Sequence, residues 1–377
     1  MLNKMSKRFL VSLFLVSFFA FPAMARISKT YPNLKIKEVE FDDLEEWDND
    51  RHDLAVNAFV KSCDKFALQP NSKKIGAGIG NIKIRDLRNV CEMAKVIDGM
   101  SNKQAKKFFE NWFTPFKVSS KKGKDTGLFT GYYEIKLYGR REKDEKYRYP
   151  IYAKPEDFDG KDKYNVREEI EDGLLDEKGL ELFYVDDKID LFFLHIQGSG
   201  QIVLENNVIK RVGFAAKNNQ PYTSIGKVMI EKGILKKKEV SAGTIKEWLR
   251  NNPDQADEIM NENQSFIFFT ELKDDYIRGA QGAVLTPERS LAVDKSIMPF
   301  GFPIWLETTL PIQNKGKTPY SRLVVSQDTG SAIKGAVRGD VFFGFGERAE
   351  ELASYMQQKG KYYILLPNNV AERMGRR

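Results

Sequence analysis

Three aspartates in the final third of the chain are the side chains best suited to acid–base chemistry. They are Asp294, Asp328 and Asp340. Asp340 directly precedes the apolar run 341–343, so burial would raise the pKa of its carboxyl group and keep a proton on it, and an ionised Asp328 nearby would act in the same direction. From the residues alone, however, Arg-Gly-Asp at 338–340 is more simply a polar turn that enters a strand, and Asp328 can cap its own turn.

Other catalytic centres find less support in the sequence. The three aspartates are too widely spaced for a hard-cation loop, whose oxygen ligands lie close together in the chain. The chain has two histidines, His52 and His195, and no Cys-x-x-Cys motif, which disfavours a zinc site or a Ser-His-Asp centre. The Gly-rich stretch 76–80 lacks the dinucleotide-binding spacing. We therefore expect no metal and no cofactor.

The first 25 residues have the pattern of a secretory signal peptide. Three basic residues precede an apolar run, residues 9–21, which ends at the Ala-x-Ala motif of residues 23–25. The run is short for a membrane span, although an uncleaved anchor is the alternative. We expect a cleaved, exported protein that begins at Arg26.

Charge and cysteine content add two further expectations. The net charge is +7 for the whole chain and +4 from Arg26 onward, where 57 Lys and Arg face 53 Asp and Glu. This mild surplus does not indicate a nucleic-acid partner; it fits either a solvated surface or an acidic polymer at close range. Cys63 and Cys91 could form a disulfide after export, or remain two buried thiols.

The elements that would hold these side chains change along the sequence from helices to strands. Apolar residues recur at helical intervals between about 51 and 116, where Thr114-Pro115 ends the last helix. Short helices are also predicted near 223–231 and 242–251. Strands are predicted at 128–135, 189–196, 201–204, 208–214, 265–269, 290–293, 304–307, 323–327, 341–343 and 362–366. Such short strands, with Gly and Pro between them, indicate a closed or nearly closed barrel.

Four stretches, in this order, resemble the membrane-bound lytic murein transglycosylase A family. They are Phe129-Thr130-Gly131-Tyr132-Tyr133, residues 195–200, residues 220–226, and residues 285–346 with the three aspartates. The similarity runs from about residue 110 to 367. It implies a mainly β fold: a double-psi β-barrel with a helical N-terminal region and a second, inserted β domain, the glycan lying between the two. The expected domains are a signal peptide (1–25), helices and the first part of the barrel (26–135), the inserted β domain (136–261), and the second part of the barrel (262–377).

The same resemblance implies a peptidoglycan lytic transglycosylase. Such an enzyme cleaves the β-1,4 bond between N-acetylmuramic acid and N-acetylglucosamine and leaves 1,6-anhydromuramoyl ends. Asp340 matches the family's single acid and base, and Asp328 is expected to support it. Substrate-binding residues are expected at Thr130, Tyr132, Tyr133, Gln197, Ser199 and Asp294. Structural roles are the alternative for several of these, namely a half-buried strand for the tyrosines, a hairpin turn for Gln197 and a loop for Asp294.

The resemblance also sets expectations for location and partners. No cysteine follows the predicted cleavage point, so the lipid attachment of the family is not expected, and we predict a periplasmic protein that can associate with the outer membrane. Residues 263–266 and Thr270 depart from the family pattern. Expected partners are peptidoglycan strands and cell-wall synthesis or division complexes; we expect no nucleic acid and a monomer.

Two other functions stay open at this stage. An inverting glycan hydrolase would need a second carboxylate, for which Glu271, Glu288 and Glu347 are the candidates. A non-catalytic, expansin-like wall-binding module would need none.

Overall fold

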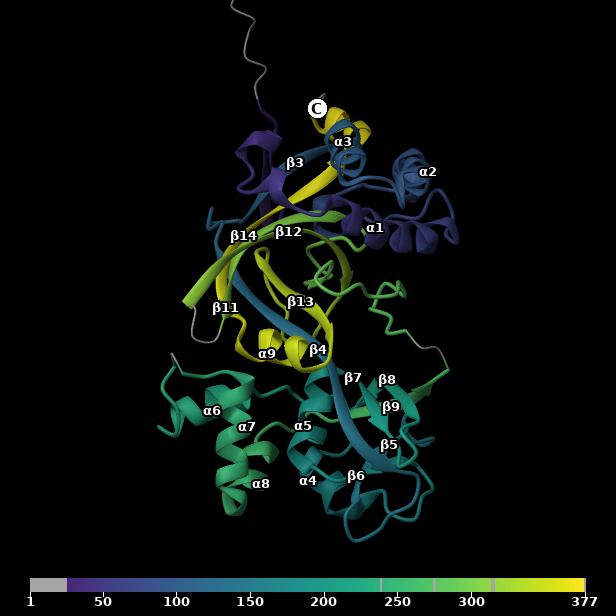
Figure 1. Ribbon diagram of the computed structural model, residues 1–377, viewed down its shortest axis with the longest axis vertical. Coiled ribbons are helices and arrows are strands. Elements are labelled where there is room, and N and C mark those ends of the chain that lie inside the picture. The colour runs from purple at the N-terminus through teal and green to yellow at the C-terminus, as the bar shows by residue number, and fades with distance from the viewer. Residues whose placement is uncertain (1–25, 238, 274–275, 313–315, 376–377) are drawn as a thin grey trace, which may run out of the picture.

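The molecule consists of two stacked regions joined by one long strand (Figure 1). The computed structural model describes residues 26–237, 239–273, 276–312 and 316–375, so the predicted signal peptide lies outside the described residues. Strand β4 (Gly127–Arg140) runs from the upper region into the lower one. Its first half pairs with strands of the upper region and its second half with strands of the lower region.

Six strands of the upper region pair in a closed circuit, which we call the strand ring. The circuit runs β14-β11-β12-β10-β13-β4 and returns to β14. The β10–β12 and β4–β13 pairs are parallel, and the other pairs are antiparallel. Besides β4, the members are β10 (Ser290–Val293), β11 (Pro303–Ile312), β12 (Gly316–Asp328), β13 (Arg338–Phe345) and β14 (Gln357–Pro367). Strands β3 (Phe113–Ser120), β2 (Leu34–Glu38) and β1 (Ser28–Thr30) extend the sheet from β14.

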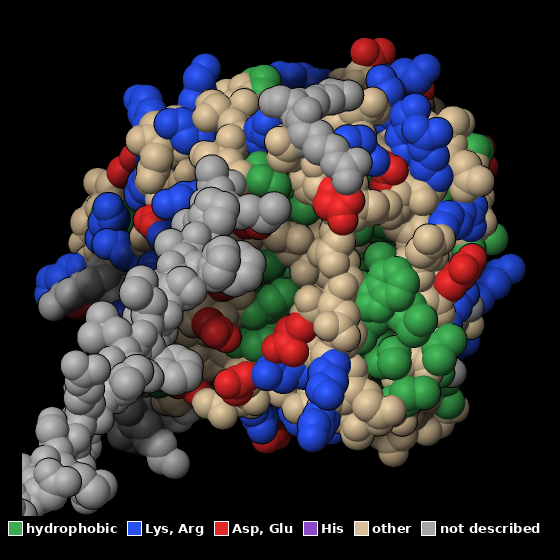
Figure 2. All heavy atoms as spheres, turned by 90° about the horizontal axis from the view of Figure 1, so that it is seen from above, with side chains coloured by type: hydrophobic (Ala, Val, Ile, Leu, Met, Phe, Trp, Pro, Cys, Tyr) green, Lys and Arg blue, Asp and Glu red, His purple; other side chains and the backbone are tan. Residues whose placement is uncertain are grey.

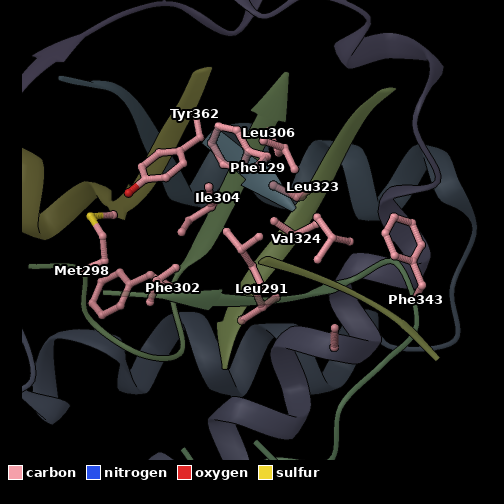
Figure 3. Close-up of a cluster of buried hydrophobic side chains, with 14 of the residues drawn as sticks. Phe129, Leu291, Met298, Phe302, Ile304, Leu306, Leu323, Val324, Phe343 and Tyr362 are labelled. Carbon is pink, nitrogen blue, oxygen red and sulfur yellow. The ribbon is translucent and has the colours of Figure 1, made fainter. Parts of the chain in front are cut away.

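Apolar side chains fill the interior of the strand ring (Figure 3). Phe129, Leu291, Ile304 and Tyr362 are fully buried there. The packing is tight enough that a Cβ atom at Gly339 would lie 2.9 Å from side-chain atoms of both Leu291 and Phe129. Because the interior is occupied, a large ligand must bind on the outside of the strand ring.

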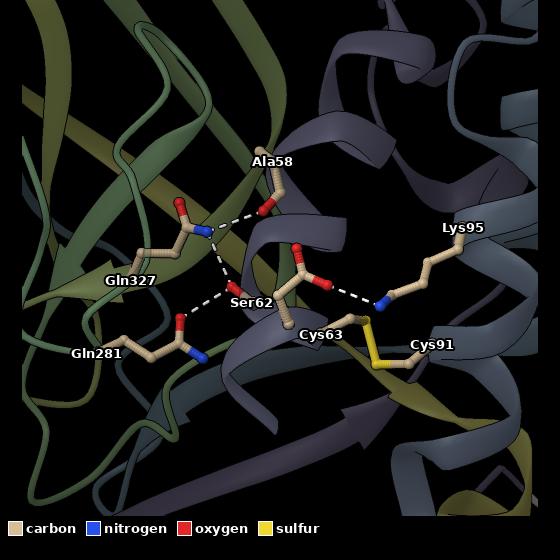
Figure 4. The surroundings of a disulfide bond; sticks show 8 residues. Ala58, Ser62, Cys63, Cys91, Lys95, Gln281 and Gln327 are labelled. Atoms are coloured by element: carbon tan, nitrogen blue, oxygen red, sulfur yellow. Dashed lines mark hydrogen bonds and ion pairs between the residues drawn. A yellow bond between two sulfur atoms is a disulfide. The ribbon is translucent and has the colours of Figure 1, made fainter. Parts of the chain in front are cut away.

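Three helices cover one side of the strand ring and brace it. They are α1 (His52–Ala67), α2 (Arg88–Ile97) and α3 (Asn102–Trp112), in agreement with the helical start predicted from the sequence. Cys63 and Cys91 form a disulfide between α1 and α2 (Figure 4). On the other side of α1, the Gln327 amide donates to the Ala58 carbonyl and to the Ser62 hydroxyl, both at 2.8 Å. Helix α1 therefore fixes the end of β12, where Asp328 lies.

The lower region mixes helices with strands, which corrects the expectation of an inserted β domain. Residues 189–196 were predicted as a strand and instead belong to helix α5 (Lys188–Gln197). A continuous apolar run fits a buried helix as well as a buried strand, so periodicity could not separate the two. The Asp187 side chain accepts from the Asp190 N–H at 2.9 Å and caps the helix start, and Gly198, with φ of 79°, ends it.

The other elements of the lower region surround α5. The helices are α4 (Arg167–Glu169), α6 (Ile225–Glu231), α7 (Ala242–Asn251) and α8 (Pro253–Asn261), and the strands are β5 (Tyr149–Tyr152), β6 (Glu181–Val185), β7 (Ser199–Val203), β8 (Ile209–Lys217) and β9 (Ile267–Leu272). Helix α9 (Glu347–Tyr355) lies between the two regions, and α10 (Asn368–Gly375) lies at the far upper end.

The surface carries charges of both signs. Figure 2 views the molecule from the α3 end and shows Lys and Arg side chains interspersed with Asp and Glu. None of the described helices is both long enough and apolar enough to cross a bilayer.

Candidate active site

A cleft of about 310 Å³ lies between the strand ring and the lower region. Strands β4 and β13 form one wall. The opposite wall comes from the end of α5, the segment before α6 and the start of α7, and α9 closes the cleft. Lining residues include Thr130, Tyr132, Arg338 and Asp340 on the first wall, and Phe192, Gln197, Tyr222, Thr223, Ala242 and Ile245 on the second.

The pairing of β4 with β13 fixes the position of Asp340. The two strands run parallel with Asp340 opposite Thr130. The Thr130 hydroxyl donates to Asp340 Oδ1 at 2.6 Å, and Arg338 Nη2 donates to the same hydroxyl oxygen at 2.9 Å. No described residue hydrogen-bonds Oδ2 of Asp340, so this oxygen can contact a ligand in the cleft.

Burial raises the pKa of the Asp340 carboxyl above its ordinary value. The Arg338 charge and the Thr130 hydrogen bond act in the opposite direction, and burial prevails. A raised pKa increases the fraction of Asp340 that carries a proton near neutral pH, which is what a general acid requires.

Asp328 lies behind the cleft wall and accepts a hydrogen bond from Tyr132. Its Oδ2 accepts from the Tyr132 hydroxyl at 2.8 Å, and its Oδ1 accepts from the backbone N–H groups of Ala280 and Thr329 at 2.9 and 2.8 Å. Burial raises the pKa of Asp328, its three hydrogen bonds lower it, and the charge of Asp340 raises it further. Both oxygens have protein partners, so the arrangement fits a residue that positions Tyr132.

Two side chains on the lower wall face the same space. Gln197 Oε1 accepts from the Tyr133 backbone N–H at 3.2 Å, and no described residue bonds its Nε2. Gln197 ends helix α5, which excludes the hairpin turn considered as the alternative to substrate binding. Tyr222 lines the cleft together with Asp340, and burial, followed by the Asp340 charge, raises the pKa of its phenol. Sequence reasoning did not select Tyr222 or Arg338 as site residues, although both lie in the stretches that carry the family resemblance.

Three expected substrate-binding residues do not line the cleft. Tyr133 is 3% exposed, and its hydroxyl donates to Glu350 at 2.8 Å. Alternate residues of a strand point to opposite faces, so Thr130 and Tyr132 face the cleft while Tyr133 faces α9. Asp294 is buried, where it accepts from Ser296 and from the Gly335 N–H, and Ser199 opens strand β7 outside the cleft.

Asp340 is the one carboxylate among the described residues that line the cleft. The candidates for a second carboxylate lie elsewhere. Glu271 pairs with Arg141 and Lys210 in the lower region, Glu288 lies near Arg348, and Glu347 begins α9.

Protein-family models and similar proteins together match most of the chain. Two protein-family models match, the MltA specific insert domain over residues 128–270 and the 3D domain over residues 289–366. Membrane-bound lytic murein transglycosylase A of Vibrio cholerae is 36% identical over 248 residues, which are 63% of this chain. The matched stretch spans 65% of that relative's length.

Solved structures match over a larger share of the chain. A membrane-bound lytic murein transglycosylase from Agrobacterium tumefaciens has a TM-score of 0.80 at 34% identity, covering 90% of this chain and 99% of that one. Escherichia coli MltA with bound chitohexaose has a TM-score of 0.67 at 26% identity, covering 82% and 89%.

Proposed function

The chain belongs to the membrane-bound lytic murein transglycosylase A family, and from this we propose that it is a peptidoglycan lytic transglycosylase. It cleaves the β-1,4 bond between N-acetylmuramic acid and N-acetylglucosamine and leaves 1,6-anhydromuramoyl ends. The observation that carries the proposal is a cleft with one half-buried carboxylate, Asp340, whose pKa is raised. The E. coli relative that holds chitohexaose supports a glycan as the ligand.

Asp340 serves first as the acid and then as the base. Oδ2 carries the proton into the cleft and gives it to the bridging oxygen as the bond to the anomeric carbon breaks. The ionised carboxylate then takes the proton of the C6 hydroxyl of the same muramoyl residue as that oxygen attacks C1. The Thr130 hydroxyl and the Arg338 charge stabilise the carboxylate between the two steps.

An intramolecular nucleophile explains why one carboxylate is enough. A hydrolase of the inverting type needs a second carboxylate to activate water. The C6 hydroxyl is already attached to the sugar that it attacks, so the entropy cost of capturing a water molecule does not arise. Tyr132, positioned by Asp328, and Gln197 and Tyr222 from the opposite wall would orient the sugars around the bond.

The proposal extends to architecture and location. The closed circuit of six strands with a filled interior supports a double-psi β-barrel formed from residues 26–135 and 262–377, with residues 136–261 as the inserted domain. A periplasmic location, with association to the outer membrane, fits the peptidoglycan substrate and the membrane-bound relatives.

The test is one incubation of the purified protein with peptidoglycan sacculi, followed by mass spectrometry of the released fragments. Anhydro ends are lighter than reducing ends by one water, so the product masses separate a transglycosylase from a hydrolase. Reducing ends would favour hydrolysis, and binding to sacculi without release of fragments would favour a wall-binding module.

A further inference from the structure

A second cavity, of about 570 Å³, lies further along the same face of β4 and β13. Alternate residues of β4 share a face, so Glu134 points the same way as Thr130 and Tyr132. Tyr132 lines the first cavity and Phe342 lines the second, with ring centroids 5.2 Å apart. At a rise of about 3.3 Å per residue, Glu134 lies about 13 Å along the strand from Thr130. The second cavity is therefore more than one sugar away from the proton donor.

Aromatic rings border this cavity. Tyr276 and Phe345 are 63% and 65% exposed, and Phe345 stands beside Glu134 in the register of β13 with β4. Large exposed rings at the mouth of a cavity indicate a binding surface, and the apolar faces of pyranose rings pack well against them.

One cation of the cavity has no ionic partner among the described residues. Lys61 of α1 is half-buried, and its Nζ donates to the neutral Thr286 hydroxyl at 2.8 Å. Burial lowers the pKa of Lys61, and the charge of Asp98, which raises it, only partly offsets the effect of burial. The neighbouring Arg211 differs, because its Nε donates to the Glu134 carboxylate at 3.1 Å. An anion placed beside Lys61 would supply the missing charge.

We propose that the second cavity binds a muramoyl residue at a distance from the cleaved bond, and that Lys61 contacts a carboxylate carried by its lactyl group. The carboxylate is either that of the lactyl group itself or that of an attached peptide. This inference rests on the proposed function, since it takes the strand in the cleft to be peptidoglycan. A chain of N-acetylglucosamine alone offers sugar faces without a carboxylate, so the cavity distinguishes muramoyl strands from chitin-like ones.

The experiment measures binding by titration calorimetry to three oligosaccharides of equal length. They are an N-acetylglucosamine oligomer, a peptide-free glycan fragment and a peptide-bearing glycan fragment. Asp340→Asn serves as the background so that no ligand is cut during the titration. Lys61→Met in this background should bind carboxylate-bearing glycan about tenfold more weakly, since a hydrogen bond to a charged group is lost. The N-acetylglucosamine oligomer should bind unchanged.

Three further variants control the experiment. Lys61→Arg keeps the charge and should keep the preference for carboxylate-bearing glycan. Lys122→Met removes an exposed cation outside both cavities and should change nothing. Lys61→Gln, which can still donate to Thr286, replaces Lys61→Met if that variant does not fold.

Each outcome decides the inference. The lactyl carboxylate is free only in the peptide-free fragment, because the peptide is attached to it through an amide bond. Weaker binding of the peptide-free fragment alone therefore assigns the contact to the lactyl carboxylate, weaker binding of the peptide-bearing fragment alone assigns it to a peptide carboxylate, and weaker binding of both shows that Lys61 contacts either carboxylate. Equal weakening for all three ligands, or no weakening, overturns the inference. Failure of the proposed function would show separately, as absence of anhydro products from the parent protein.

Discussion

The strand ring and the lower region contribute to the cleft in different ways. Asp340, Thr130 and Arg338 stand on two strands of the ring, where backbone register sets their distances. Gln197 and Tyr222 stand at a helix end and in a loop of the lower region, where side-chain packing sets them. The groups that we propose for proton transfer therefore stand on paired strands, and the groups that we propose to orient the sugars stand on the lower region. Substitutions on the two walls should therefore change turnover by different amounts and through different steps.

The largest effect is expected on the ring wall. Asp340→Asn removes the proposed proton donor and should lower turnover by about a hundred- to ten-thousandfold, as measured by the release of anhydro fragments from sacculi. Binding to sacculi should persist, because the shape of the cleft is unchanged. Asp172→Asn, an exposed substitution in the lower region, is the control. Turnover close to that of the parent would remove Asp340 from the mechanism.

The same substitution has a predictable effect on stability. Burial raises the pKa of Asp340, so the folded state holds its proton more tightly than the unfolded state does. The parent protein therefore loses stability as pH rises from the ordinary value of 3.8 through the raised pKa. The amide of the Asp340→Asn variant cannot ionise, so denaturant unfolding at neutral pH should show a more stable variant, and the gain should vanish below pH 3.8. A less stable variant at neutral pH would contradict the buried, proton-retaining carboxyl.

The next effect concerns the link between the two regions. Lys246 of α7 is 7% exposed, and its Nζ lies 2.9 Å from Asp190, 3.1 Å from Glu350 of α9 and 3.2 Å from the Tyr133 hydroxyl. Lys246→Met should destabilise the protein by about 3 kcal/mol in denaturant unfolding, the lower end for a broken buried pair, because Glu350 is 47% exposed and screened by water. Lys227→Met, which breaks an exposed pair with Glu231, should cost less than about 1 kcal/mol.

This link should also weaken in acid. Burial alone would raise the pKa of Glu350, but Lys246 and the Tyr133 hydroxyl lower it overall. A lowered pKa contributes stability above the ordinary value of 4.5, which is lost as pH falls below it. Unfolding measured across this range should show a pH-dependent part that Lys246→Met reduces. An unchanged pH profile in the variant would show that Glu350 is stabilised by other groups.

The smallest expected effects come from two tyrosine substitutions, one on each wall of the cleft. Tyr132→Phe leaves the half-buried Asp328 without one of its donors, and turnover should fall about tenfold. Tyr222→Phe removes a hydroxyl from a residue that is 40% exposed, and turnover should fall about two- to threefold, mainly through a higher KM. A larger loss for Tyr222→Phe than for Tyr132→Phe in the same sacculus assay would reverse the comparison.

The sequence predicted the strand ring better than the lower region, for physical reasons. The strands predicted at 304–307, 323–327, 341–343 and 362–366 each lie within an observed strand, and β10 is found where it was predicted, at 290–293. Helix α5 was mistaken for a strand because an apolar run carries no period; Asp187 and Gly198, which cap it, were the signals that could have corrected this. Closure of the ring depends on pairings between distant segments, which local patterns do not contain.

The sequence likewise predicted the site residues of the strand ring better than those of the lower region. Asp340, Thr130 and Tyr132 lie together as the resemblance implied. Tyr133, like Tyr132, was expected to offer its ring face to a sugar, but neighbouring strand residues face opposite ways and Tyr133 is buried away from the cleft. Tyr222 was missed because its part in the cleft depends on how the lower region folds back toward Asp340, and no spacing in the sequence records that.

The hydrogen bond between Thr130 and Asp340 joins residues 210 positions apart, on strands that flank the whole lower region. Strand β13, which carries Asp340, follows the lower region in the sequence, so a chain that ends before β13 lacks the proposed proton donor. Such a chain also lacks β13 and β14, which are needed to close the strand ring. Chains truncated before β13 should be inert toward the cell wall.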